Sequence, residues 1–260
     1  MLMRTKKDKF LREATTPILM YHQVDSLQDK RMPMRGLVVT PRTFYSHMLT
    51  LKLLGFTGLS MRDLAPYLSG DKKGRVVGIT FDDGYLNNFE NALPILKFFG
   101  FSATCYVVTQ FAGKFNAWDA TKGVFPAPLM NHNHMECWIS AGQDIGAHTR
   151  THADLRECSD QQVVDEIEGS RNDLLNLFGK EYTQAFCYPY GRYDLRALKA
   201  VKKAGYLTAT TTQRGRANVN DDIYRLPRIL VSRTTMPFSL TAKLLTKYED
   251  NRREKTKTSI

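Results

Sequence analysis

Seven short apolar segments recur along the 260-residue chain, and helical patterns lie between most of them. This alternation predicts parallel strands joined by crossover helices, because parallel strands are buried on both faces and consist of nearly continuous apolar residues. About seven such units in one α/β domain favour a barrel over an open sheet. The predicted strands cover residues 17–21, 75–81, 102–108, 143–148, 185–190, 206–211 and 225–231.

Four helices are predicted between these strands. Helix starts are indicated by Thr40 with Pro41 and by Ser159, and a glycine follows the end of each helix. The predicted helices cover residues 41–54, 87–99, 160–178 and 195–204. The segment 113–136 breaks the rhythm, and we expect it to form a long surface loop over the functional site.

The two ends of the chain differ from the middle in composition. Residues 249–260 are polar, and we expect them to form a frayed or disordered C-terminal tail. Residues 1–14 are predicted to form a similar N-terminal tail. One folded domain is therefore expected over residues 15–248, with no linker and no internal repeat inside it.

Charge and cysteine content limit the environment and the partners. The net charge is +11, and ten Lys or Arg residues oppose three Asp residues between Arg192 and Arg233. Such a surface attracts polyanions, including anionic lipids and phosphorylated substrates, although a generic basic surface explains it equally well. Nucleic acid is disfavoured because no basic helix carries interleaved aromatic residues. Four dispersed cysteines and a charged start without a signal peptide favour the cytoplasm, with the inner membrane face as a second location.

Unusual polar residues follow two of the predicted strands. Asp82 and Asp83 come directly after residues 75–81, and His148 ends the strand at 143–148, four residues before His152. Adjacent buried carboxylates are unfavourable unless something uses their charge, and a metal ion does so. Two histidines and one carboxylate leave positions open for water and substrate, as in catalytic metal sites. Asp82 would then be free to accept a proton. A simple turn and two surface histidines are the alternative interpretations.

Three ordered motifs carry a resemblance to a known family. TFDDG at 80–84, HTRTH at 148–152 and YPYG at 188–191 resemble the motifs of the polysaccharide deacetylases, carbohydrate esterase family four. The resemblance covers about residues 17–231. It implies a distorted (β/α)7 barrel and a hydrolase that removes N-acetyl groups from sugars.

The resemblance also implies a role for each motif residue. Asp82 would be the general base, while Asp83, His148 and His152 would hold a divalent metal, zinc before nickel, cobalt or iron. The backbone N–H of Tyr190 would help to stabilise the oxyanion. These roles are expectations for the structure to place in space.

The position of the general acid departs from the usual pattern of the family. The family commonly has a late acid histidine, yet no histidine follows His152 here. His22, directly after the first strand, resembles the acid of the poly-N-acetylglucosamine deacetylase subset, although a strand-end histidine without a role is the alternative. His47 is expected to be structural, and His132 and His134 are expected in the loop.

A cation beside the base is the second departure from the family. The third motif has no Arg before it, although an arginine there commonly pairs with the base. Arg228 on the last predicted strand is the candidate replacement, and Arg225 is the alternative. A surface position without a role is equally compatible with the sequence.

Together these features predict metal-dependent hydrolysis of an N-acetyl or N-acyl group on a saccharide, in surface-glycan or lipopolysaccharide metabolism. The basic surface adds a lipid-linked saccharide as a second kind of substrate. A catalytically inactive carbohydrate-binding barrel is the alternative from another class, and the intact set of acidic residues and histidines argues against it.

Overall fold

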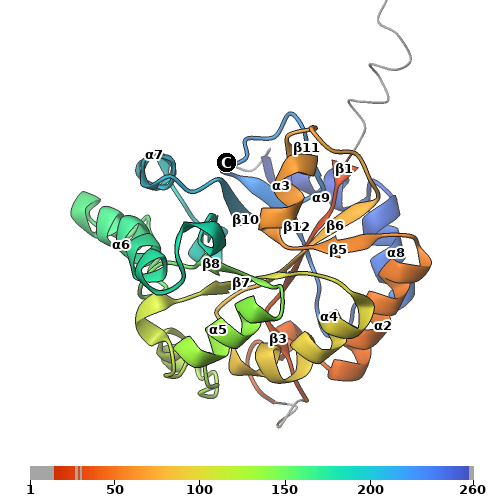
Figure 1. Cartoon of the computed structure of the whole chain (residues 1–260), viewed down its shortest axis with the longest axis horizontal. Helices are drawn as coiled ribbons and strands as arrows, with labels where there is room; N and C mark the ends of the chain where they lie inside the picture. Colours follow the sequence, from red (N-terminus) through yellow and green to blue (C-terminus); the bar gives the residue numbers. More distant parts are fainter. Residues whose placement is uncertain (1–14, 27–28, 30, 258–260) are drawn as a thin grey trace, which may run out of the picture.

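The computed structural model describes residues 15–26, 29 and 31–257, and seven parallel strands form a closed barrel within it (Figure 1). The order of the strands around the barrel follows their order in the chain, and the first strand pairs with both the second and the last. The predicted (β/α)7 barrel is confirmed, and every predicted strand overlaps one of the seven. They are β2 (Ile18–Tyr21), β6 (Val76–Phe81), β7 (Thr104–Val107), β8 (Asp144–Ala147), β9 (Ala185–Cys187), β10 (Thr208–Arg214) and β12 (Leu226–Leu230).

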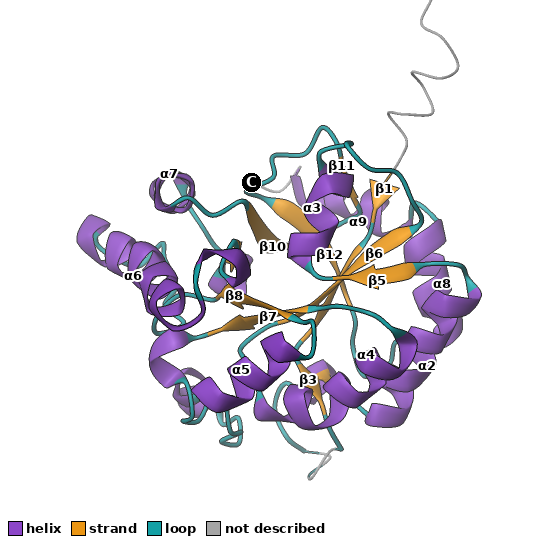
Figure 2. Ribbon diagram, viewed as in Figure 1, coloured by secondary structure: helices purple, strands orange, loops and turns teal. Residues whose placement is uncertain are grey.

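Helices surround the barrel on its outside (Figure 2). All four predicted helices are present, and their local sequences explain where they begin. The side chain of Thr40 accepts a hydrogen bond from the backbone of Thr43, and Ser159 forms a capping box with Gln162. The predicted helix at 87–99 begins with a π-helical turn, η2 (Asn88–Ala92), and continues as an α-helix. The four helices are α2 (Pro41–Leu53), α4 (Leu93–Phe99), α6 (Asp160–Phe178) and α7 (Leu195–Ala204).

Helix α3 (Met61–Leu68) covers the N-terminal end of the barrel. Its apolar side chains belong to the buried cluster that also contains Ile18 and Tyr106. This cluster is distinct from the larger core under the outer helices. The backbone N–H of Met61 donates to the side chain of Thr104, the first residue of β7. Because α3 closes this end, the loops after the strands at the opposite end are left to form a site.

Several elements were not predicted. Strand β5 (Thr57–Leu59) pairs with the start of β6, and α8 (Pro237–Leu245) packs near α2. Helix α3 was missed because Pro66 lies inside it, and an internal proline argues against a helix. Two small pairs complete the sheet structure: β1 (Thr15–Thr16) with β11 (Ala217–Asn218), and β3 (Gln23–Val24) with β4 (Val38–Val39).

The expected loop at 113–136 is partly wrong. It contains a 3-10 turn, η4 (Ala117–Lys122), and the beginning of α5 (His132–Ser140). The side chain of Asn131 accepts from the backbone of His134, whose ring accepts from the backbone of Asn131. This capping pair starts a helix that the weak intrinsic preference of His and Asn did not indicate. His132 and His134 are therefore helical residues.

The expected disorder from residue 249 onward is also wrong for most of that segment, because Tyr248–Lys257 forms helix α9. Glu249 is fully buried, with its carboxylate 2.7 Å from Arg214 Nε and 2.9 Å from Lys243 Nζ. Asp250 pairs with Arg216 in the same way. These ion pairs join α9 to the last part of the barrel.

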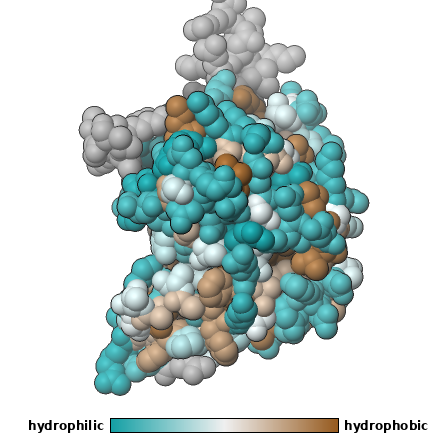
Figure 3. All heavy atoms as spheres, turned by 90° about the vertical axis from the view of Figure 1, so that its left-hand side faces the viewer, coloured by the Kyte–Doolittle hydropathy of each residue, from teal (hydrophilic) through white to brown (hydrophobic). Residues whose placement is uncertain are grey.

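The face that carries α6 and α7 is hydrophilic with scattered apolar groups (Figure 3). Within the described ranges, no helix combines the length and the apolar character needed to span a membrane. All four cysteines are free thiols.

Glu249→Ala is predicted to lower the free energy of unfolding by about 2 kcal/mol, because it leaves Arg214 and Lys243 without their buried partner. Asn251→Ala, at an exposed position of the same helix, is the control and should change stability little. Chemical denaturation measures both. Equal stability of the two variants would show that α9 does not contribute through Glu249.

Candidate metal and catalytic site

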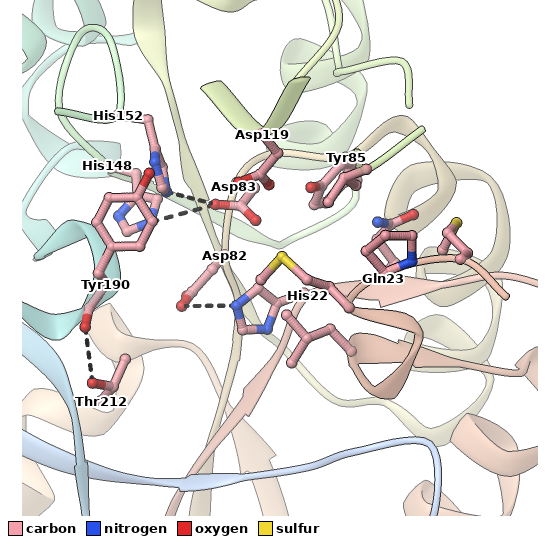
Figure 4. A pocket seen from close by; sticks show the side chains of 15 residues that line it. His22, Gln23, Asp82, Asp83, Tyr85, Asp119, His148, His152, Tyr190 and Thr212 are labelled. Atoms are coloured by element: carbon pink, nitrogen blue, oxygen red, sulfur yellow. Dashed lines mark hydrogen bonds and ion pairs between the residues drawn. The ribbon is translucent and has the colours of Figure 1, made fainter. Parts of the chain in front are cut away.

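The predicted site residues converge at the C-terminal end of the barrel (Figure 4). They follow β2, β6, β8 and β9 in the chain and line one cavity of about 70 Å³. The cavity lining includes His22, Asp82, Asp83, His148, His152 and Tyr190. Segments separated by up to 168 residues in sequence therefore meet at one place, since the carboxyl ends of parallel strands share one rim.

Three of these side chains form a compact group of metal donors. Asp83 Oδ1 lies 3.5 Å from His148 Nε2 and 3.2 Å from His152 Nε2. All three residues are buried. Tetrahedral zinc with bonds of about 2.1 Å separates its ligand atoms by about 3.4 Å, so the spacing fits a divalent metal.

The hydrogen bond made by His148 supports the same interpretation. Its Nδ1 lies 2.7 Å from the carbonyl oxygen of Cys187, which can only accept a hydrogen bond. Neutral His148 therefore carries its proton on Nδ1 and turns the Nε2 lone pair toward Asp83. Two acceptors facing each other require a proton or a cation between them. Burial alone raises the pKa of the Asp83 carboxyl, but where protons fill that position, hydrogen bonds from the two imidazoles hold this pKa well below its usual value.

Backbone strain is concentrated in the same loops. Among the described residues, five non-glycine residues have a positive φ, and four of them lie in the motifs after β6, β8 and β9. These four are Asp83 (φ 74°), Thr149 (φ 64°), His152 (φ 64°) and Tyr190 (φ 57°). Each such conformation costs about 1–3 kcal/mol and persists where the surroundings impose it, as commonly happens at functional sites.

Asp82 forms a buried bidentate ion pair with Arg228. Both oxygen–nitrogen distances are 2.7 Å, and Arg228 is completely buried. Its Nε also donates to the carbonyl of Thr211, and its NH1 donates to Thr80 Oγ1. Burial would raise the pKa of Asp82, but the charge and hydrogen bonds of Arg228 outweigh that effect and hold it below its usual value. The alternative candidate, Arg225, pairs instead with Asp222 at the surface.

His22 lies at the edge of the cavity, with its Nε2 4.0 Å from Asp82 Oδ2. Asn88 in η2 holds the backbone around it, because its amide nitrogen donates to the carbonyl of His22 and its oxygen accepts from the N–H of Val24. Asn88 was not predicted as part of the site, and nothing in its sequence context indicates this role. π-Helical turns such as η2 are frequent at functional sites.

The segment η4 covers one side of the cavity. The ring of Trp118 stacks on His152 at a centroid distance of 4.7 Å, and the buried carboxylate of Asp119 lines the cavity. Lys122 contacts Asp119 at 2.8 Å and lies over the Tyr190 ring at 4.5 Å. No function is predicted for these side chains from the sequence, although the segment is expected to lie over the site.

The remaining histidines lie outside this cavity. His47 is buried in α2, with its Nε2 2.7 Å from the carbonyl of Thr235 and its Nδ1 3.2 Å from the Tyr21 hydroxyl. His134 caps α5, and His132 lines a different cavity of the described structure. None of the three is among the residues that line the catalytic cavity.

The fold and the site together define the class of protein: a parallel β/α barrel with a candidate catalytic metal site, formed by buried Asp-His-His donors at its C-terminal rim. Comparison with known proteins identifies the family. A family model described as polysaccharide deacetylase matches residues 69–209. YxkH of Bacillus subtilis strain 168, provisionally named a polysaccharide deacetylase, is 32% identical over 84% of this chain and 72% of its own.

Two further relatives agree with this match. A poly-beta-1,6-N-acetyl-D-glucosamine N-deacetylase of Staphylococcus epidermidis is 28% identical over 75% of this chain and 68% of its own. The solved structure of the deacetylase PplD from Streptococcus pyogenes, in complex with acetate, has a TM-score of 0.78 at 27% identity and covers 89% of this chain and 98% of that one. The chain belongs to the polysaccharide deacetylase family, and the expected enzyme class, a deacetylase hydrolase, is confirmed.

His152→Gln is predicted to weaken zinc binding by more than about 100-fold, because loss of a ligand exceeds the effect of losing a supporting contact. Asp82→Asn should keep the affinity within a few-fold of wild type, since Asp82 lies outside the proposed ligand set. Competition titration against a chromophoric chelator measures both. Equal affinity of wild type and His152→Gln would remove His152 from the ligands.

Proposed function

We propose that this protein hydrolyses the N-acetyl group of an amino sugar in a polysaccharide, with a divalent metal held by Asp83, His148 and His152. The observation that carries the proposal is the position of Asp82, buried and paired with Arg228, beside those three donors in one cavity. Zinc is the first candidate, and nickel, cobalt and iron suit the same donor set. A bound metal of this kind supplies Lewis acidity that polarises a carbonyl and acidifies water.

Asp82 is the proposed general base. Arg228 holds it ionised, and each of its oxygens keeps a second lone pair beyond the one that faces Arg228. A water molecule between Asp82 and the acyl carbon would give its proton to Asp82 as the oxygen attacks. The bidentate pair also fixes the direction in which the carboxylate faces the substrate.

His22 is the proposed general acid. The C–N bond breaks only when the sugar nitrogen receives a proton, since an amide anion is a poor leaving group. His22 lines the cavity beside Asp82, with its Nε2 4.0 Å from Asp82 Oδ2. Its proton would pass to the departing amine, so that acetate and a free amino sugar are released.

Tyr190 is proposed to act through its backbone. Its left-handed conformation turns the peptide at the cavity wall, and its carbonyl accepts a hydrogen bond from Thr212 at 3.1 Å. A backbone N–H fixed in this way suits the developing oxyanion, which is the usual large electrostatic term in acyl transfer.

The small catalytic cavity supports an acyl group as the part of the substrate that enters it. Its volume of about 70 Å³ suits a few heavy atoms and is far below the usual range for whole drug-sized ligands. The named relatives give a polysaccharide substrate more support than a lipid-linked one. The lipid-linked substrate, the cytoplasmic location and a role in surface-glycan or lipopolysaccharide metabolism stay predictions from the sequence. An inactive sugar-binding barrel has no need of the buried Asp82–Arg228 pair.

Asp82→Asn is predicted to lower kcat for acetate release from N-acetylglucosamine oligomers by about 1,000-fold, the typical contribution of a general base. Metal content should stay at the wild-type level. The matched control is Asp165→Asn, at an exposed position of α6, which should retain wild-type activity. Wild-type turnover by Asp82→Asn would exclude Asp82 as the base.

His22→Gln is predicted to lower N-acetyl hydrolysis by about 100-fold or more, because the amine leaving group then lacks its proton donor. Hydrolysis of an aryl acetate should fall much less, since a phenolate leaves without protonation. Steady-state assays of both substrates with one enzyme preparation give the comparison. An equal loss on the two substrates would contradict a general-acid role and would indicate that His22 acts on Asp82 instead.

A further inference from the structure

A second, larger cavity adjoins the catalytic one. Its volume is about 480 Å³, compared with about 70 Å³ for the catalytic cavity. The two share Gln23, Met32 and Val124 in their linings, so they lie next to each other. We name it the side cavity. Its lining includes Gln23, Asp25, Asn87, Glu90 and Phe125.

The side cavity is acidic in a protein whose net charge is +11. Three carboxylates line it, from Asp25, Asp29 and Glu90, and its described lining contains no Lys, Arg or His. Asp29 is paired with Arg31. Within the described part of the chain, Asp25 and Glu90 form no ion pair, so their charge is available to a ligand.

Asn87 gives an independent indication of a ligand in the side cavity. It is only 6% exposed, and its amide nitrogen donates to Gln23 Oε1 at 2.9 Å and to Asp25 Oδ2 at 3.3 Å. Its oxygen is buried and has no hydrogen-bond partner among the described residues. An unsatisfied buried acceptor costs about 1–3 kcal/mol, so a small turn of the Asn87 amide toward a ligand donor in the side cavity would lower the free energy.

The lining favours a cationic sugar over a metal ion. No three described side chains of the side cavity are placed to hold a metal ion, since the groups that are so placed consist of Asp82, Asp83, His148, His152 and Cys187. Most of the other lining residues are apolar, and they include Phe125, which is half exposed, and Pro126. An apolar wall opposite a few polar groups is the usual composition of a small-molecule site, and a sugar ring presents matching C–H and polar edges.

We propose that the side cavity is a subsite for a sugar unit that carries a free, protonated amine, next to the unit whose N-acetyl group is being removed. This inference rests on the proposed function and extends it. Asp25 and Glu90 hold the ammonium group, and Asn87 Oδ1 accepts a hydrogen bond from the same unit. Because the reaction itself produces such amines, the enzyme acts preferentially on chains that are already partly deacetylated.

The kinetic test uses two β-1,6-linked trisaccharides, one fully N-acetylated and one with a single free amine at a terminal unit. Wild-type kcat/KM for acetate release should be about 10-fold higher on the amine-bearing substrate. In the double variant Asp25→Asn, Glu90→Gln this ratio should fall to about 1. The control, Asp165→Asn with Glu136→Gln, makes the same charge change at exposed positions and should keep the ratio. A wild-type ratio of 1, or a ratio unaffected in the Asp25/Glu90 variant, would overturn the subsite.

A binding test separates the subsite from the proposed catalysis. Calorimetry with Asp82→Asn should detect a fully deacetylated β-1,6-linked glucosamine disaccharide, with affinity that falls as salt is raised. Binding should be lost when Asp25→Asn and Glu90→Gln are added. Equal binding of the N-acetylated disaccharide, or displacement of the amine by millimolar calcium, would contradict the proposal. If the disaccharide binds but no oligosaccharide is hydrolysed, the proposed function fails while the amine subsite stands.

Discussion

The ion pair between Asp82 and Arg228 joins the end of β6 to the last strand of the barrel. Both partners are removed from water, so loss of either would leave an uncompensated buried charge, at a cost of about 3–5 kcal/mol. The guanidinium also donates to Thr80 of β6 and to the backbone of Thr211 in β10, so it contacts one further strand. An ionised carboxylate is thereby fixed one residue before Asp83, and the geometry of the whole site follows from that position.

The barrel explains why this pair can serve a reaction. Helix α3 closes the N-terminal end, and the loops after the strands carry the strained residues Asp83, His152 and Tyr190 at the other end. Strain of this kind is tolerated because packing around it is complete, including Trp118 on His152. At the same rim, Asn88 holds the backbone of His22. The proposed base and the proposed acid therefore both depend on supporting side chains, Arg228 and Asn88, that contact no reacting atom.

Charge is distributed unevenly over the molecule. Its net charge is +11, and half-buried arginines on α7 and β10 pair with acids of neighbouring helices. The side cavity is the opposite case, with the carboxylates of Asp25 and Glu90 beside a catalytic cavity that shares Gln23 with it. A local acidic cavity on a basic protein concentrates an amine where the average surface would repel it.

The sequence by itself determined the seven strands and the positions of Asp82, Asp83, His148 and His152, because buried parallel strands are apolar runs and polar residues directly after them stand out. It also indicated His22 and Arg228 as candidates, through their places directly after the first predicted strand and on the last one. Only the tertiary structure decided that Arg228 and not Arg225 contacts Asp82, that His132 begins a helix, and that Glu249 anchors α9. Asn87, Asn88 and Asp119 likewise gained their places from contacts with distant segments. Such contacts leave no periodic pattern in the chain, so they become visible only when the barrel brings the segments together.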